Sequence, residues 1–200
     1  MTQKAGRWNH NIHYHSVILN AVPAGARLAL DIGCGEGMLA RQLQQRIPDV
    51  TGIDLDEASI GLAETRNSEG VHFLRGDFVT YPFEPESFDF VVSVATLHHL
   101  DAISALSRVR ELLRPGGVLC IIGLASGRLP RDLPIELAAA VVHRFHSRTK
   151  GWWQHPSPTL PTPPETYGDM RRIAIELLPG ASFRRRLLWR YSLTWTKPSP

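Results

Sequence analysis

The sequence predicts an α/β fold built on one doubly wound, mostly parallel sheet. Three observations predict it: short apolar runs alternate with helical segments, a glycine-rich turn follows the first run, and acidic residues stand at or just past the ends of the first three. Strands that alternate with helices imply crossover connections and a parallel sheet with helices on its faces. At 200 residues, 43% apolar and 20% charged, the chain can form one domain with a substantial core.

The chain is expected to begin with a helix over residues 8–20. Side chains that share one face recur there at helical spacing: His10, His13, Tyr14, Val17 and Ile18. Tyr14 is therefore expected to point inward. Residues 28–32 then form a short apolar run typical of a buried parallel strand. A tight glycine turn follows, and a helix from Met38 ends before Pro48.

Four more strands continue the alternation. They are expected at residues 50–54, 71–74, 88–93 and 118–123. Two helices between them begin at residues that can cap a helix: Asp56 precedes a helix toward Asn67, and Asp101 precedes a helix over residues 101–113. An Arg-Pro-Gly-Gly turn at 114–117 leads into the fifth strand.

The pattern changes after Gly123. A helix is expected over residues 133–147, followed by a proline-rich loop, and residues 124–165 together are expected to form a lid after the fifth strand. Thr162 to Glu165 reads as a capping box for a helix that ends near Leu178. The aromatic and branched residues 183–195 predict a hairpin with its turn near Trp189.

Composition indicates the compartment and the charge balance. Cys34 and Cys120 both lie in apolar segments, which favours a reducing, cytoplasmic setting without a disulfide framework. Residues 1–15 lack the apolar stretch of a signal peptide, and no run is long enough for a membrane span. Residues 126–200 carry 12 basic and 5 acidic side chains. This basic C-terminal segment favours an acidic substrate or nucleic acid, unless Arg184, Arg185 and Arg186 are simply solvated strand residues.

The turn at residues 33–37, Gly-Cys-Gly-Glu-Gly, is the first candidate binding site. Glycines let backbone approach a ligand closely, and the next helix offers its positive N-terminus. A tight structural turn would have the same sequence. Asp54 follows Gly33 by 21 residues, where a doubly wound fold places a carboxylate for ribose hydroxyls, and Asp77 could accept the amino group of adenine. All three segments lie at the carboxyl ends of strands, which predicts a nucleoside site.

These motifs resemble the class I S-adenosylmethionine-dependent methyltransferases, in particular the small-molecule bacterial type. Four segments between about residues 28 and 123 carry the resemblance: Leu30 to Gly37, Gly52 to Asp56, Gly76 to Phe78, and Leu113 to Gly117. The resemblance implies a Rossmann-like sheet of seven strands with an antiparallel last strand. A dinucleotide dehydrogenase is the rival, but Met38 stands where its G-x-G-x-x-G fingerprint needs a third glycine.

The resemblance also implies S-adenosyl-L-methionine as cofactor and a role for each matched residue. Gly33, Cys34 and Gly35 would face the methionine portion, and Asp31 would orient its amino group. Asp54, beside Leu55, would hold the ribose. The remaining cofactor contacts would come from Asp77, Phe78 and Val94, with Tyr14 either closing over the cofactor or packing in the core.

Histidines near the end of the fourth strand are the candidates for catalysis. His98 and His99 could act as a general base, because an unperturbed imidazole has a pKa near neutrality. Either could instead only pack on the cofactor. Three other histidines, His143, His146 and His155, lack a convincing set of metal ligands, so no metal is expected. Trp152 and Trp153 could line an apolar substrate pocket or fasten the lid.

The sequence leaves three functions open. The first is methyl transfer to a small-molecule oxygen, nitrogen or carbon, with no nucleic-acid or membrane partner. An Asn-Pro-Pro-Tyr signature for adenine methylation is absent after the fourth strand, although other RNA targets of the basic residues 126–200 stay open. RNA methylation is thus the second possible function, and the third is a binding module that keeps the cofactor without turnover.

Overall fold

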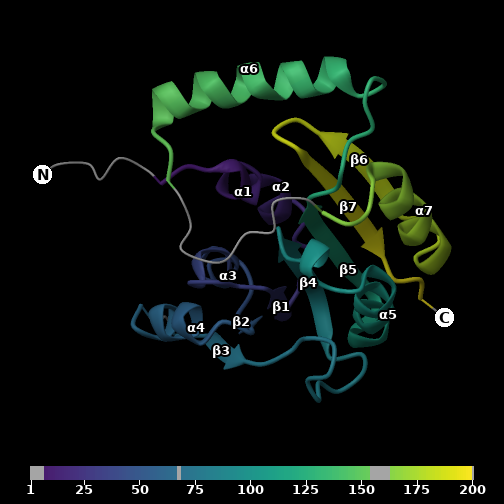
Figure 1. Cartoon of the computed structure of the whole chain (residues 1–200). Helices are drawn as coiled ribbons and strands as arrows, with labels where there is room; N and C mark the ends of the chain where they lie inside the picture. The colour runs from purple at the N-terminus through teal and green to yellow at the C-terminus, as the bar shows by residue number, and fades with distance from the viewer. Residues whose placement is uncertain (1–6, 67–68, 154–162, 200) are drawn as a thin grey trace, which may run out of the picture.

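One seven-stranded sheet forms the centre of the molecule (Figure 1). The computed structural model describes residues 7–66, 69–153 and 163–199. The strands are β1 (Leu28–Ile32), β2 (Asp49–Asp54), β3 (Val71–Arg75), β4 (Phe88–Val94), β5 (Leu113–Gly123), β6 (Ser182–Arg186) and β7 (Arg190–Thr196). Their order in the sheet is β3-β2-β1-β4-β5-β7-β6.

Strand directions confirm the predicted doubly wound topology. Strands β1 to β5 run parallel, and β7 pairs antiparallel with both β5 and β6. The order reverses between β1 and β4, so the loops after these two strands diverge to opposite faces of the sheet. Such a switch point opens a crevice at the carboxyl ends of the strands, which is where open α/β sheets bind ligands.

Helices cover both faces of the sheet. They are α1 (His10–His13), α2 (His15–Leu19), α3 (Met38–Gln44), α4 (Glu57–Glu64), the short 3-10 helix η1 (Leu97–His99), α5 (Ala102–Leu112), α6 (Leu133–Lys150) and α7 (Tyr167–Leu177). In β1, Leu30 and Ile32 join the apolar cluster beneath α5 and α7, whereas Ala29 joins the cluster beneath α2 and α3. This alternation follows the two-residue period of a strand.

Three local predictions are wrong, and the first two concern the N-terminal helix and β5. The expected helix over residues 8–20 is broken at Tyr14, whose φ of −98° and ψ of 2° separate α1 from α2. The Tyr14 hydroxyl donates a hydrogen bond to the carbonyl of Leu187 at 2.7 Å, so a contact with the C-terminal hairpin holds this residue. In β5, residues 114–117 belong to the strand instead of forming a separate turn, with a register irregularity against β4.

The capping box of the last helix also lies elsewhere than predicted. Thr166 and Asp169 form it, and α7 begins at Tyr167. Residues 163–165 precede the helix because Ser126 bonds to them: its hydroxyl donates to the carbonyl of Pro163 at 2.6 Å, and its N–H donates to that of Glu165 at 2.8 Å. Thr162 lies outside the described residues.

The hairpin turn near Trp189 is confirmed, and its backbone conformation explains why no glycine or proline marks it in the sequence. Leu188 and Trp189 both have positive φ, 55° and 56°, a conformation usually taken by glycine or asparagine. Leu188 is fully buried, so burial of its side chain can offset the backbone strain.

Helix α6 crosses the molecule outside the sheet (Figure 1). Ala139 is its one buried residue among those the structure describes. Glu136 attaches the helix to the hairpin, accepting hydrogen bonds from Trp189 Nε1 and, at 2.9 Å, from Arg185 Nη2. No described helix is both long and apolar enough to span a bilayer.

Candidate functional site

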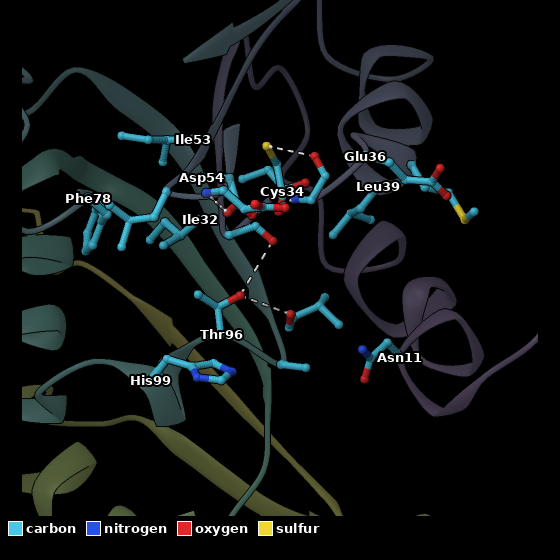
Figure 2. Close-up of a pocket in the computed structure, with 18 of the residues that line it drawn as sticks. Asn11, Ile32, Cys34, Glu36, Leu39, Ile53, Asp54, Phe78, Thr96 and His99 are labelled. Carbon is cyan, nitrogen blue, oxygen red and sulfur yellow. Dashed lines mark hydrogen bonds between the residues drawn. The ribbon is translucent and has the colours of Figure 1, made fainter. Parts of the chain in front are cut away.

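A cavity of about 460 Å³ opens at the carboxyl ends of β1, β2 and β4. Figure 2 shows side chains from these strand ends converging on it. The predicted site residues that line the cavity are Asp31, Gly33, Cys34, Gly35, Asp54, Leu55, Asp77, Phe78, Val94, His98 and His99. The structure therefore brings together residues that lie up to 68 positions apart in the chain.

Tyr14 is the one predicted site residue that does not line this cavity. Its side chain is buried, and its hydroxyl is bonded to Leu187 in the hairpin turn. Tyr14 packs in the core with the N-terminal segment, which is the other position that the sequence allowed for it. Tyr14 therefore lies outside the cavity in which the other predicted cofactor-binding residues meet.

Glycine is required at the tip of the loop after β1. Gly33 has a φ of +71°, and a Cβ atom built on it would lie 2.0 Å from Oγ1 of Thr96. The N–H groups of Gly33 and Cys34 both donate to the carbonyl of Ile53, at 2.8 and 3.1 Å. These contacts fix the loop between the ends of β2 and β4 and leave its backbone facing the cavity.

Asp54 fastens the same loop from the end of β2. Its Oδ2 accepts a hydrogen bond from the N–H of Gly35 at 2.8 Å, and its Oδ1 accepts one from the N–H of Asp56 at 2.9 Å. A carboxylate oxygen has two acceptor sites, so each oxygen can accept one more donor. Asp54 can therefore bind a pair of ligand hydroxyls while it holds the loop.

Asp31 places an incompletely paired carboxyl group in the cavity. It is only 2% exposed, and its Oδ2 has no hydrogen-bond partner within the described residues. Burial, followed by the nearby charge of Asp54, raises the pKa of Asp31 to about 7. A buried acceptor without a partner is costly, so this position favours a ligand that brings a donor, above all a cationic amino group.

The remaining groups at this end are neutral or apolar. Burial, with the charges of Asp31 and Asp54, raises the pKa of the Cys34 thiol, which therefore stays protonated. Phe78 is 4% exposed and offers an apolar surface, while Asp77 Oδ1 accepts from the N–H of Val79 at 2.9 Å. An aromatic ring beside a fixed carboxylate suits a heteroaromatic base with an amino group.

The loop after β4 forms the opposite wall. Ala95 has a φ of 55°, a strained conformation for a residue with a side chain, and strain of this kind is common at functional sites. His98 is buried and His99 is exposed, with their ring centroids 4.1 Å apart. Burial, His99 and Arg190 lower the pKa of His98 to about 4, and its Nδ1 has no partner within the described residues. His98 is therefore neutral at physiological pH.

Sequence reasoning missed several residues of this cavity. They come from the two ends of the chain and from the glycine turn: Asn9, Asn11, His15, Glu36 and Arg190. Trp153, from the loop after α6, also lines the cavity, which is one of the two positions that the sequence allowed for it. Segments this far apart meet only through tertiary packing, so no local motif marks them. Glu36 was the exception, since it stands inside the glycine turn; it forms ion pairs with Arg7 and Arg66.

The histidines considered as metal ligands lie outside this cavity or outside the described residues. Within the described ranges, no group of three or more His, Cys, Asp or Glu side chains is arranged to hold a metal ion. His143 and His146 instead lie in a ring cluster with Trp8, His10 and His13 between α6 and the N-terminal segment. His155 lies outside the described residues.

Comparisons with known sequences identify relatives along nearly the whole chain. The family model described as a methyltransferase domain matches residues 30–121. An uncharacterized methyltransferase of Mycobacterium tuberculosis is 39% identical over 193 residues, which cover 96% of this chain and 98% of the relative. A phthiotriol/phenolphthiotriol dimycocerosates methyltransferase of Mycobacterium ulcerans is 33% identical over 144 residues, 70% of this chain and 53% of that protein.

Solved structures share the fold. The PH0226 protein of Pyrococcus horikoshii has a TM-score of 0.67 at 18% identity, covering 93% of this chain and 88% of its own. An S-adenosylmethionine-dependent methyltransferase from Mesorhizobium loti has a TM-score of 0.61 at 20% identity, covering 90% and 95% of the two chains. At these identities the likeness establishes the Rossmann-like architecture.

Proposed function

Since the chain belongs to the class I S-adenosylmethionine-dependent methyltransferases, we propose that it transfers the cofactor's methyl group to an oxygen, nitrogen or carbon atom of a small molecule. The observation that carries the proposal is the buried, unpartnered carboxyl oxygen of Asp31 beside Asp54 at the glycine loop. When bound, S-adenosylmethionine supplies an electrophilic methyl group on a sulfonium.

The acidic end of the cavity would hold the cofactor. Asp31 accepts from the amino group of the methionine portion, and Asp54 accepts from the ribose hydroxyls with its remaining lone pairs. Asp77 and Phe78 receive the adenine, while Leu55 and Val94 supply apolar contacts beside it. The backbone of residues 33–35 passes along the methionine portion, where Gly33 admits close approach.

His98 would act at the other end as the proton acceptor. It is neutral at physiological pH, it is buried, and its Nδ1 has no partner among the described residues. An oxygen or nitrogen acceptor must lose a proton as the new bond forms, and a neutral imidazole can take it. The lowered pKa of His98, about 4, makes it a weaker base than a free imidazole in the absence of ligands. His99 is exposed, so we assign the role to His98. Asn11 and Trp153 line the same space and would help to align the acceptor and exclude water.

The charge pattern supports a small-molecule acceptor over RNA. Several basic side chains of residues 126–200 are neutralised by carboxylates, among them Arg172, Arg185 and Lys197. The relative from Mycobacterium ulcerans, named for phthiotriol and phenolphthiotriol dimycocerosates, is consistent with this choice.

Calorimetric titration with S-adenosylmethionine and S-adenosylhomocysteine tests the proposal. The native chain should bind both, and Asp54→Ala should bind with about 10- to 100-fold lower affinity, because ribose hydroxyls lose a charged acceptor. Asp49→Ala is the matched control, since Asp49 is exposed at the opposite end of the same strand. A native chain that binds neither compound refutes the cofactor assignment.

Assays of methylated product and of the salt dependence of RNA binding distinguish the proposed function from the other two, a binding module and an RNA methyltransferase. Binding of the cofactor with no methylated product from a panel of small molecules would indicate a binding module. RNA binding that weakens steeply with added salt would instead favour an RNA acceptor.

A further inference from the structure

Arg190 is a buried cation that faces the cavity. It is the first residue of β7 and only 8% exposed. Because β7 runs antiparallel to β5, with Tyr191 opposite Gly123, its first residue lies at the carboxyl end of β5. The fold therefore delivers a guanidinium to the same edge of the sheet as the cofactor loops.

The partners of Arg190 are all neutral. Its Nε and Nη2 donate to Oδ1 of Asn11 at 3.2 and 2.7 Å, and its Nη1 donates to the carbonyls of Leu188 and Trp189 at 3.3 and 3.2 Å. Within residues 7–66, 69–153 and 163–199, no carboxylate forms an ion pair with it. By contrast, the more exposed Arg185 on β6 pairs with two carboxylates, Asp132 and Glu136.

An arginine buried without a carboxylate is expensive, because desolvation of the cation is only partly offset by neutral acceptors. Burial lowers the pKa of Arg190 to about 10, so the side chain is still charged at neutral pH. Its guanidinium carries five N–H groups, and the four bonds to Asn11, Leu188 and Trp189 leave one donor on Nη2. The Asn11 amide adds its own N–H donors at the cavity wall.

The position of Arg190 is at the acceptor end. Its charge contributes to the lowered pKa of His98, the proposed proton acceptor, whereas the charge that raises the pKa of Asp31 is that of Asp54. Figure 2 shows Asn11 reaching toward the cavity from the N-terminal helix, with Thr96 and His99 on the loop after β4. The cavity is thus acidic where the cofactor would lie and basic where the acceptor would lie.

From this arrangement we infer that Arg190 and Asn11 bind an anionic group of the methyl acceptor, a carboxylate or a phosphate. The inference rests on the proposed function and narrows the acceptor to acidic small molecules. The carboxylate of the cofactor's methionine portion has the same chemistry, and the experiment below separates the two sources. Arg190 is a specificity residue in this account: it holds the acid group while His98 takes the proton.

The test uses benzoate and its neutral analogue benzamide as probes of the protein saturated with S-adenosylhomocysteine. Binding is followed by NMR through the Nε–H signals of the arginines. Benzoate should bind at least tenfold more tightly than benzamide and should shift the Arg190 signal. Arg190→Gln should abolish the preference, whereas Arg184→Gln, at an exposed position on β6, should leave it unchanged. Equal binding of the two probes to the native protein overturns the inference, with no need for a variant.

A second arm distinguishes the acceptor from the cofactor. S-adenosylhomocysteine and methylthioadenosine, which lacks the amino-acid portion, are titrated into native protein and Arg190→Gln. Unchanged affinity for both supports an acceptor site. A selective loss of S-adenosylhomocysteine affinity assigns Arg190 to the cofactor's carboxylate and overturns the inference. If the native chain binds neither compound, the proposed function itself fails, which is a separate result.

Discussion

At the scale of single residues, burial sets the charges on which binding depends. Asp31 and His98 are both buried and both lack a partner for one polar atom within the described residues. Desolvation moves their pKa values toward the neutral forms, upward for the carboxyl group and downward for the imidazole. At neutral pH, therefore, His98 is neutral and Asp31 is about half protonated, and each has one polar atom that a ligand could pair.

Asp31 predicts a pH-dependent cofactor affinity. An amino group bound to Asp31 favours the ionised carboxylate, whereas in the free protein the pKa of Asp31 is about 7. Binding below that pH must therefore displace a proton, so affinity should fall by up to about tenfold per pH unit. Calorimetry with S-adenosylhomocysteine at about pH 6, 7 and 8 measures the slope.

Asp31→Asn is the companion variant for this measurement. Asparagine keeps the shape of the protonated acid, so the fold should persist, but binding should be weaker and nearly independent of pH over this range. If Asp31→Asn retains the native slope, another group is responsible and the amino group lies elsewhere.

At the scale of elements, the glycine loop is a short segment whose backbone conformation is set by three strands. Gly33→Ala would force a side chain into a left-handed conformation and against Thr96. The expected loss of unfolding free energy is about 2–4 kcal/mol, together with loss of cofactor binding. Urea unfolding measures the first effect, and calorimetry measures the second.

Gly61→Ala is the matched control. Gly61 lies inside α4, and a Cβ atom there would meet nothing within 4 Å. Alanine is the better helix former, so this variant should gain about 1 kcal/mol. The account of the loop fails if Gly33→Ala is as stable as the native chain.

Elements with strong local signals were predictable, and those set by distant contacts were not. The strands at 28–32 and 88–94, and the caps Asp56 and Asp101, follow from apolar runs and side-chain chemistry that lie within a few residues. The break at Tyr14 depends on a bond to Leu187, which lies 173 positions away. The start of α7 similarly depends on Ser126, so a plausible local capping signal was overridden.

At the scale of the whole molecule, the same limit applies to the site. The proposed cofactor half comes from the ends of β1, β2 and β3, each with its own motif, and the sequence predicts Asp31, Asp54 and Asp77 there; all three line the cavity. The acceptor half joins Asn11 to Arg190 across 179 positions. Nothing near either residue marks it as part of a site, and only the folded sheet reveals the pair.

Titration of buried histidines should make the stability of the whole chain depend on pH. The folded-state pKa of His98 is about 4, below its unfolded value of 6.5. The stability that neutral His98 contributes is fully present above the unfolded pKa and is lost as the pH falls toward 4. The loss of unfolding free energy reaches about 2 kcal/mol at pH 5. Asp31 has the opposite sign: its raised pKa stabilises the folded chain at low pH, and that stability is lost as the pH rises through 7.

A variant isolates the histidine effect from that of Asp31. Between about pH 7.5 and pH 5, His98→Gln should lose about 2 kcal/mol less unfolding free energy than the native chain. His72→Gln, at an exposed position on β3, should follow the native curve. Denaturant unfolding at each pH makes the measurement, and parallel curves for native and His98→Gln would show that His98 is not buried in its neutral form.

A crystal structure of the chain with S-adenosylhomocysteine tests the central claim most directly. The account predicts ribose hydroxyls at hydrogen-bond distance from the Asp54 carboxylate, about 2.7–3.2 Å, with the amino group on Asp31 and the adenine beside Phe78. A nucleoside bound away from the ends of β1, β2 and β3, or an amino group that leaves Asp31 unpartnered, would contradict it.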